Sequence, residues 1–345
     1  MLNGVSRTFA LTIPQLPEPL CRVVSNAYLL CRIVDTIEDE PALGAMEKRY
    51  FCRKFVSAVN GKLDAEKFAA DLVPRLSAQT AAAEHELVRN APRVIRIASD
   101  FRQSERKALQ RCIRIMARGM GEFQLRSGTN GLENLEELDR YCYHVAGVVG
   151  EMLTELFCLY SSDIARNRDS LMALAVPFGQ GLQMTNILKD IWEDCECGAC
   201  WLPRETFAEV GFDLEDLTTG QNREAFARGL YRLVSVARGH LKNALTYTLL
   251  IPRRETGIRN FCLWAIGFAL LTLRKIHKNL SFTDGEQVKI SRLSVMGTIL
   301  ASRLSVQNDL LLRALFYLAA RPLPRAEGDG AWAEVPGVKR SSGSR

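Results

Sequence analysis

The sequence predicts an all-α fold, and three observations support this. Apolar residues recur at steps of three and four along most of the 345-residue chain, which is the period of a helix with one buried face. Runs that alternate apolar and polar residues between turn signals are nearly absent, so a β-sheet is not expected. The breaks between the apolar stripes are short and carry Pro, Gly or Asn, as expected between helices.

The stripes predict the helices in chain order. The first stripe consists of Leu20, Val23, Val24, Ala27, Leu30, Cys31 and Val34. Further stripes run through 108–125, 139–160, 170–194, 224–250, 260–280 and 295–320. Breaks are expected near 41–42, 60–61, 127–131, 195–203, 251–257 and 283–285. We expect a single helical domain over 1–322, followed by a flexible tail over 323–345 that is rich in Gly, Pro, Ser and charge.

The composition is that of a folded protein, with 47% apolar and 24% charged residues. The net charge of +6 is spread along the chain without a basic block, which suits anionic small molecules or a membrane surface rather than nucleic acid. Ten cysteines, most of them in apolar stretches, indicate a reducing cytoplasm. We expect neither a signal peptide nor a membrane-spanning helix, since Phe261–Leu273 is too short to span a bilayer.

An acidic cluster ends the first stripe. Asp35, Glu38 and Asp39 are spaced by three and four, so their carboxylates share one helix face. This face continues the apolar stripe, because Asp35 follows Cys31 by four residues and Glu38 follows Val34 by four. Carboxylates turned toward the interior repel one another and lose hydration unless a cation compensates them. Clustered carboxylate oxygens favour Mg²⁺ or another hard cation.

The same spacing recurs at Asp190, Glu193 and Asp194, and Gln183 and Asn186 extend it upstream as a polar ribbon. One D-x-x-E-D alone is most often a solvated helix end. Two copies with the same spacing, each joined to an apolar face, favour a functional site. Two acidic helices that face each other across a cavity would hold Mg²⁺ ions, which would in turn bind a diphosphate.

Three cations lie close to these clusters in the sequence: Arg7, Arg32 and Lys189. Arginine suits phosphate oxygens because it donates paired hydrogen bonds. Taken singly, each cation is as often a surface charge or a member of a structural ion pair. We expect them to bind the phosphate oxygens that the metal leaves free.

An aromatic segment, YCYHVAGVVG, opens the stripe at 139–160. A tyrosine here could present its ring face to a carbocation and its hydroxyl to a leaving diphosphate or a departing proton. Without the acidic clusters, core aromatics on a packed helix would be the better interpretation. Gly147 and Gly150 permit close packing against a neighbouring helix or a bulky ligand.

Together these segments resemble the squalene and phytoene synthase family. The resemblance runs from VSRTF at 5–9 to about residue 310, and its landmarks are SRTF, LLCRIVDTIEDE, YCYHVAGVVG, and QMTNILKDIWED followed by WLP. It implies an isoprenoid-synthase-type helical bundle around a central apolar cavity. It also implies a prenyltransferase that uses Mg²⁺ or Mn²⁺ to join two farnesyl diphosphates head to head into presqualene diphosphate. Such an enzyme needs a dry cavity that protects carbocations from water.

The resemblance also implies roles for individual residues. The metal ligands would be Asp35, Glu38, Asp39, Asp190, Glu193 and Asp194. The catalytic residues would be Tyr141, Asp35, Asp39, Asp190 and Asp194. The substrate would contact Ser6, Arg7, Phe9, Tyr28, Arg32, Gln183, Asn186 and Lys189.

Within the family, one segment favours members that reduce the intermediate to squalene with NADPH. FTDGEQVKISR at 282–292 resembles the stretch whose basic residues contact this cofactor, which implies Lys289 and Arg292, with Asn186, as its ligands. No G-x-G-x-x-G follows a strand, so a Rossmann site is not expected. Phytoene or dehydrosqualene synthesis, or release of presqualene diphosphate without reduction, stays open, as does the choice between C15 and C20 donors.

The chain departs from the family pattern at a few points. Ala199 follows Gly198 where the family has an arginine, and Lys189 replaces another arginine. The chain begins five residues before Ser6, so we expect an upstream helical segment to be missing. A C-terminal membrane anchor is also not seen. We therefore expect a monomer of bacterial type that is cytoplasmic or contacts the membrane peripherally for product release.

Two other interpretations are weaker. Cys195, Cys197 and Cys200 have no fourth Cys or His at an ordinary zinc spacing, so we interpret them as incidental thiols in a loop. A non-catalytic helical scaffold could use the acidic residues as a docking surface. Such a surface would not need acids aligned with core stripes.

Overall fold

The computed structural model describes residues 1–6, 8–123, 130–219 and 221–325. Within these ranges the secondary structure is helical, apart from one isolated β-bridge between Leu132 and Pro203. The prediction of an all-α fold is therefore confirmed. All ten cysteines are free of disulfide bonds.

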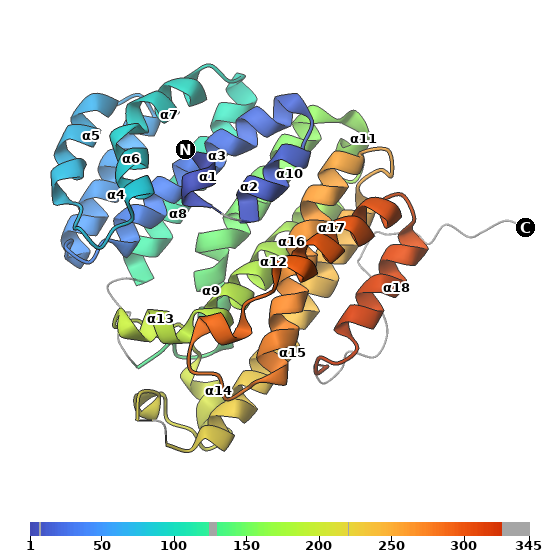
Figure 1. Ribbon diagram of the computed structural model, residues 1–345. Coiled ribbons are helices and arrows are strands. Elements are labelled where there is room, and N and C mark those ends of the chain that lie inside the picture. Colours follow the sequence, from blue (N-terminus) through green and yellow to red (C-terminus); the bar gives the residue numbers. More distant parts are fainter. Residues whose placement is uncertain (7, 124–129, 220, 326–345) are drawn as a thin grey trace, which may run out of the picture.

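The first group of helices lies at the upper left of Figure 1. It comprises α1 (Leu2–Val5), α2 (Thr8–Thr12), α3 (Glu18–Asp39), α4 (Ala45–Val59), α5 (Ala65–Leu72), α6 (Ala82–Arg89), α7 (Ala91–Ser99) and α8 (Gln103–Phe123). Sequence reasoning identified α3 and α8 but described no helices between them, because α5 to α7 are short and carry no long apolar stripe.

The remaining helices form the centre, the right side and the lower part of the molecule (Figure 1). They are α9 (Leu135–Cys142), a π-helical turn (Tyr143–Gly147), α10 (Val148–Tyr160), α11 (Ser162–Ala165), α12 (Arg168–Lys189), α13 (Ile191–Glu196), α14 (Arg204–Ala208), α15 (Arg223–Leu250), α16 (Thr256–Lys278), α17 (Arg292–Ser305) and α18 (Asp309–Ala320). The stripe over 295–320 is therefore two helices. Asn308 separates them, because its side chain accepts a hydrogen bond from the Leu311 N–H, 3.0 Å away, and caps α18.

The sequence of α3 explains where this helix begins and ends. Pro19 stands in its first turn, where a missing N–H costs nothing. The whole first stripe is buried, as predicted. The helix ends at Asp39, because Pro41 disfavours the helical conformation in Glu40, whose ψ is 113°.

The core consists of two large apolar clusters and a smaller third one. The long helix α12 joins the two large clusters: Leu171 and Leu174 pack into the first, and Met184 and Leu188 into the second. The packed part of the chain extends slightly beyond the predicted domain boundary at residue 322. Leu323 is buried in the second cluster, although it was expected to belong to the flexible tail. The rest of the predicted tail, from 326, lies outside the described residues.

Glycines allow α10 and α12 to approach closely. A Cβ atom at Gly150 would collide with the carbonyl oxygen of Ala175, and one at Gly179 would collide with that of Ala146. The predicted role of Gly150 in close helix packing is therefore confirmed. This contact holds α12 against the segment that follows Tyr141.

Candidate active site

The first acidic motif lies in the last turns of α3. The Asp35 side chain is 25% exposed and that of Asp39 is 64% exposed, whereas Glu38 is buried. The Lys48 ammonium donates a hydrogen bond to the backbone carbonyl oxygen of Glu38. Only Asp35 and Asp39 therefore present accessible carboxylates, although the spacing predicted that all three would share one face.

Arg32 lies among three carboxylates. Its Nε donates a hydrogen bond to Glu84 Oε1 at 2.9 Å. Its Nη1 lies 3.7 Å from Asp35 Oδ2, and its Nη2 lies 4.0 Å from Asp39 Oδ2. Glu84 comes from α6 and was not predicted, because no spacing in the sequence connects it with α3. The contact places an arginine, the residue best suited to bind phosphate, next to the acidic motif.

The second acidic motif lies at a break between two helices. α12 ends at Lys189, and Asp190 has φ −99° and ψ 15°, outside the α-helical range, before α13 begins. The expected continuous helix over 170–194 is therefore interrupted at Asp190. The Asp190 N–H still donates to the Asn186 carbonyl oxygen at 2.9 Å, and Lys189 Nζ lies 3.1 Å from Asp190 Oδ1.

The three carboxylates of this second motif differ in exposure. Glu193 is exposed, and its carboxylate fills the space where a Cβ atom of Gly285 would lie. Asp190 and Asp194 are half-buried. Glu193 thus faces the turn at Gly285–Val288, while Asp194 lies close enough to the first motif for the charge of Asp39 to raise its pKa.

Electrostatics link the two motifs. The pKa of Asp194 is raised to about 7, first by burial and then by the nearby charges of Asp190, Asp39 and Glu193. Burial also raises the pKa of the Tyr141 hydroxyl well above its usual value, with contributions from Glu38, Asp194 and Asp39. Charges influence one another this strongly only at short range. The C-terminal end of α3 and the α12–α13 junction therefore share one electrostatic environment around Tyr141.

The pKa of Asp35 is also raised to about 7. Burial is the main cause, the guanidinium of Arg32 opposes it, and the nearby charges of Asp39 and Glu84 add to it. One arginine therefore does not neutralise this group of carboxylates. A further cation would lower their mutual repulsion.

Tyr141 is held between two aromatic rings. Its ring stacks on that of Trp201, with centroids 4.0 Å apart and planes inclined by 9°, and it meets Phe123 edge-on at 5.3 Å. The π-helical turn Tyr143–Gly147 follows directly, a local irregularity often found at functional sites. The sequence suggested that a tyrosine here could present its ring face to a carbocation and its hydroxyl to a leaving diphosphate or a departing proton. In the structure, Trp201 covers one face of the Tyr141 ring.

The carboxylates of the two motifs are suited to hold Mg²⁺ only together with a bound ligand that supplies further oxygen atoms. Among the described residues, no group of three or more Asp, Glu, His or Cys side chains lies close enough to hold a metal ion alone. Mg²⁺ usually keeps several waters and binds through one or two carboxylates plus substrate phosphates. The half-buried aspartates of both motifs, with their raised pKa values, suit this second arrangement.

The N-terminal residues predicted to contact substrate lie together beside α3. The Phe9 N–H donates to Ser6 Oγ at 2.9 Å, and the rings of Phe9 and Tyr28 lie 5.1 Å apart. The Tyr28 hydroxyl donates to the Val5 carbonyl oxygen at 3.1 Å, and Arg32 follows one turn later on the same helix. Arg7 lies outside the described residues.

The remaining predicted residues lie on α12 and in the segment that leads into α17. Gln183 is half-buried and Asn186 is exposed on α12. Lys289 pairs with Glu286, and Arg292 is exposed at the start of α17.

The segment carrying these basic residues packs against α13. The Trp192 Nε1–H donates to the Phe282 carbonyl oxygen at 2.8 Å, and Glu193 contacts Gly285. The predicted cofactor segment is therefore adjacent to the second acidic motif.

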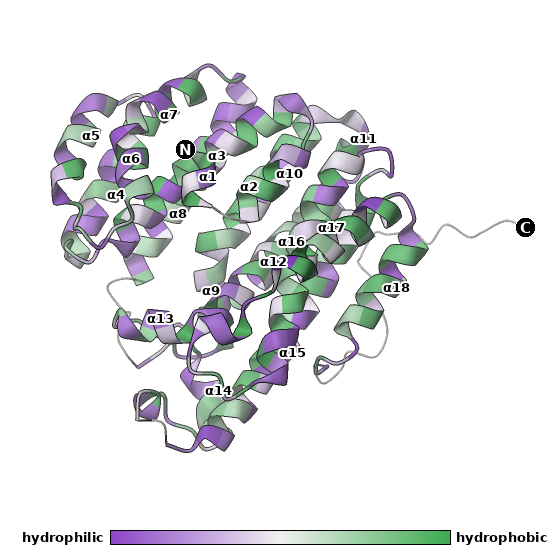
Figure 2. Ribbon diagram, viewed as in Figure 1, coloured by the Kyte–Doolittle hydropathy of each residue, from purple (hydrophilic) through white to green (hydrophobic). Residues whose placement is uncertain are grey.

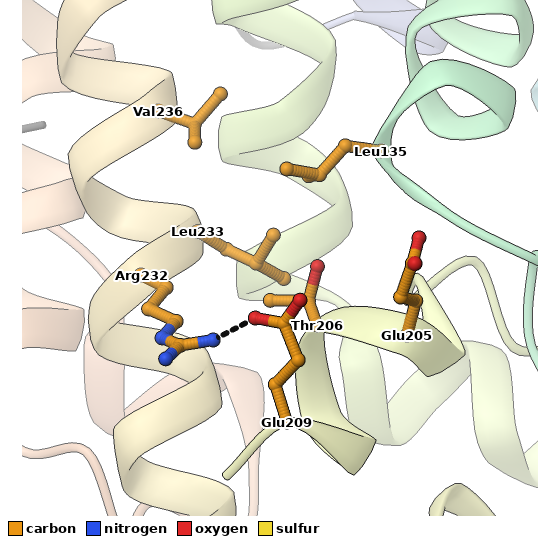
Figure 3. A pocket seen from close by; sticks show the side chains of 7 residues that line it. All are labelled: Leu135, Glu205, Thr206, Glu209, Arg232, Leu233 and Val236. Atoms are coloured by element: carbon orange, nitrogen blue, oxygen red, sulfur yellow. Dashed lines mark hydrogen bonds and ion pairs between the residues drawn. The ribbon is translucent and has the colours of Figure 1, made fainter. Parts of the chain in front are cut away.

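A small hollow elsewhere is unrelated to these side chains. It is lined by Leu135, Glu205, Thr206, Glu209, Arg232, Leu233 and Val236 (Figure 3). Arg232 and Glu209 form an ion pair at its edge. None of the predicted site residues lines it, and we assign it no function.

The sequence is similar to those of known proteins. The sequence profile described as squalene/phytoene synthase matches residues 2–294. Squalene synthase of Cyberlindnera jadinii is 28% identical over 309 residues, which are 88% of this chain and 66% of the relative. Squalene synthase of Eremothecium gossypii is 30% identical over 308 residues, with the same coverage of 88% and 66%. The chain thus spans just under two thirds of the length of these relatives.

Solved structures share the fold. The complex of TcSQS with the ligand BPH1237 has a TM-score of 0.73 at 24% identity, covering 96% of this chain and 91% of that chain. The TcSQS complex with E5700 has a TM-score of 0.70 at 26% identity, covering 93% and 89%. A dehydrosqualene synthase in complex with a ligand has a TM-score of 0.59 at 18% identity, covering 89% and 94%.

Proposed function

The chain belongs to the squalene/phytoene synthase family, and we propose that it joins two farnesyl diphosphates head to head and reduces the product to squalene with NADPH. One observation carries this proposal. Asp39 and Asp194, from two D-x-x-E-D motifs far apart in the sequence, both raise the pKa of the buried Tyr141 hydroxyl, and Asp39 also raises that of Asp194.

We propose that the aspartates of the two motifs hold Mg²⁺ or Mn²⁺ together with the diphosphate. These are Asp35 and Asp39 on α3, and Asp190 and Asp194 at the α12–α13 junction. When bound, the metal supplies Lewis acidity that polarises the phosphoryl oxygens. Glu38 and Glu193 remain candidate ligands, and Glu193 would first have to turn away from Gly285.

The cationic side chains of the site would bind the remaining phosphate oxygens. Arg32 reaches both aspartates of the first motif, and Lys189 pairs with Asp190. Each is therefore placed to move from a carboxylate to a phosphate that binds at the same point. We propose the same role for Arg7. Ser6, Phe9, Tyr28, Gln183 and Asn186 would contact the rest of the substrate.

The reaction would proceed through cations that the protein must keep dry. The C–O bond to the diphosphate breaks, and the double bond of the second farnesyl diphosphate captures the allylic cation. Loss of a proton then closes the cyclopropane of presqualene diphosphate. Because its pKa is raised, the Tyr141 hydroxyl stays protonated and would donate a hydrogen bond to the leaving diphosphate. Exclusion of water by the surrounding apolar side chains prevents quenching.

The reductive step would use the segment that contacts α13. A second ionisation and rearrangement of presqualene diphosphate would be followed by hydride transfer from NADPH. We propose Lys289, Arg292 and Asn186 as the groups that bind the cofactor. The hydrogen bond from Trp192 to Phe282 supports this role, because it holds the segment at the second motif.

An alternative is release of presqualene diphosphate, dehydrosqualene or phytoene without reduction. Ala199 favours this alternative, because it removes a cation expected near the second motif. We further propose that residues 1–322 form one monomeric domain that is cytoplasmic and contacts the membrane peripherally.

The decisive test incubates the purified protein with farnesyl diphosphate and Mg²⁺, with and without NADPH, and identifies the products by mass spectrometry. We expect squalene only with NADPH. Asp190→Asn should abolish turnover, whereas Asp169→Asn, which changes an exposed acid at the start of the helix that precedes Asp190, should not. Absence of product from both C15 and C20 donors, or full activity of Asp190→Asn, would overturn the proposal.

A further inference from the structure

Helices α17 and α18 expose an unusual number of large apolar side chains. On α17 these are Leu293, Met296, Leu300 and Leu304, which are between 61% and 80% exposed. On α18 they are Leu310, Leu311, Tyr317 and Leu318. We call these eight residues the apolar face. A surface helix normally turns such a stripe toward the core.

Helix α17 carries apolar side chains on two faces: Val295 and Ile299 pack against the third core cluster, whereas its leucines are exposed. Ser302 and Ser305 point inward and are buried, and their hydroxyls donate to the carbonyl oxygens of Thr298 and Ala301 in the preceding turn. Local bonds of this kind satisfy the hydroxyls without water. Two serines of α17 thus face the protein, while its leucines face outward.

The apolar face is held firmly in place. α17 packs on α16, and α18 packs on α15, α16 and α17. The buried Arg259 of α16 donates to Asp309 Oδ1 at 2.5 Å and so ties down the start of α18. Both helices lie at the right of the molecule in Figure 1, where Figure 2 shows α18 as largely hydrophobic.

The charge around the apolar face is positive. Between residues 292 and 321 the sequence has four arginines, Arg292, Arg303, Arg313 and Arg321, and one acid, Asp309. Asp309 is already engaged by Arg259 and Arg253. An apolar stripe bordered by cations is the pattern of helices that lie in the interface of an anionic membrane.

We propose that the apolar face docks onto an anionic lipid bilayer, with its leucines among the acyl chains and its arginines at the headgroups. This deepens the proposed peripheral location by naming the surface and the lipid charge, and it does not depend on which product is formed. A second copy of the chain is a poorer partner, because a symmetric contact would bring the two positive borders together. Residues 326–345 contain few large apolar residues and so could not match this face.

Vesicle flotation of the full chain tests the proposal. We expect binding to vesicles of phosphatidylcholine with phosphatidylglycerol, weaker binding to phosphatidylcholine alone, and weakening by salt. The triple variant Leu293→Glu, Leu300→Glu, Leu304→Glu should reduce binding at least about tenfold. Leu310→Glu with Leu318→Glu on α18 should act in the same way, which makes the test independent of one helix.

Met46→Glu is the matched control, since Met46 is equally exposed but lies on α4. It should bind like the unaltered protein, and thermal unfolding should be the same for all variants. Unchanged flotation of both multiple variants would overturn the proposal. Sedimentation of the protein as a dimer that these variants dissociate would also overturn it, because a second copy would then cover the apolar face. Stronger flotation of a chain that ends at Arg325 would overturn it as well, because residues 326–345 would then cover the face. Flotation and turnover are separate measurements, so each proposal can fail alone.

Discussion

The ring of Tyr141 lies flat against the indole of Trp201, with centroids 4.0 Å apart. Trp201 belongs to the WLP segment that follows the second acidic motif, whereas Tyr141 lies in the last turn of α9, ahead of that motif in the chain. The stack therefore joins two of the landmarks and sets the direction of the Tyr141 hydroxyl. It also explains why the tyrosine is nearly inaccessible despite its polar group.

Removing either partner of this stack should have a distinct effect. Tyr141→Phe keeps the stack but loses the hydroxyl, so kcat should fall about 10²-fold or more while the unfolding temperature is unchanged. Trp201→Ala leaves a cavity and should cost about 3–5 kcal/mol of stability as well as activity, and Trp201→Phe should restore much of both. Tyr143→Phe is the control for the hydroxyl. Equal kcat for Tyr141→Phe and the unaltered enzyme would contradict the role given to Tyr141.

Glu84 should compete with substrate for Arg32. Glu84→Gln removes the charge that holds the guanidinium, so the KM for farnesyl diphosphate should fall several-fold while kcat changes little. Glu86→Gln, an exposed acid on the same helix, should leave both constants unchanged. Steady-state kinetics at saturating Mg²⁺ provide the measurement. A KM that rises instead would mean that Glu84 positions Arg32 for the substrate.

The metal-free protein should become less stable as pH rises from about 4 to 7. Asp35 and Asp194 each have a pKa raised to about 7, so between these pH values the folded state holds protons that the unfolded state has released. The free energy of unfolding should therefore fall, by up to about 1.4 kcal/mol per pH unit for each of the two carboxyl groups. Urea titrations in EDTA measure it. The double variant Asp35→Asn, Asp194→Asn should lose this dependence, and a slope of the opposite sign would show that the carboxylates are compensated.

Asp309 should contribute strongly to stability. It engages Arg259, whose side chain is fully buried, so Asp309→Ala leaves an uncompensated cation and should cost about 3–5 kcal/mol. Asp169→Ala, an exposed acid, should cost much less. Partial burial acts to raise the pKa of Asp309, but Arg259 and Arg253 hold it below its usual value. Its contribution should thus be present above about pH 4 and be lost as pH falls further, which urea titrations across pH would detect.

Gly150→Ala should separate α10 from α12. The added methyl group would meet the backbone of Ala175, which cannot move alone, so a loss of about 1–3 kcal/mol is expected. Gly239→Ala on α15 is the control, because a Cβ atom there meets nothing within 4 Å. That change should stabilise the helix by about 0.5–1 kcal/mol. Thermal unfolding of the two variants should shift in opposite directions.

Local patterns predicted much of this architecture. The steps of three and four identified α3 and its buried face, because burial along one helix depends only on the helical period. The repeated D-x-x-E-D spacing identified both acidic motifs for the same reason. Boundaries were less accurate: Asp190 interrupts the expected helix, and Asn308 divides the last stripe into two. A cap or a single non-helical residue changes the path of the chain without changing the apolar period.

The sequence on its own therefore established the helical class, the two carboxylate motifs and the family resemblance. It could not pair Glu84 with Arg32 or Trp201 with Tyr141, nor indicate that Glu38 is buried while Asp39 is accessible. It also did not reveal the outward leucines of α17, whose period is the same whichever way the stripe faces. These features arise from packing between segments distant in the chain, because an apolar or acidic stripe defines a helix face but not the neighbour that this face meets.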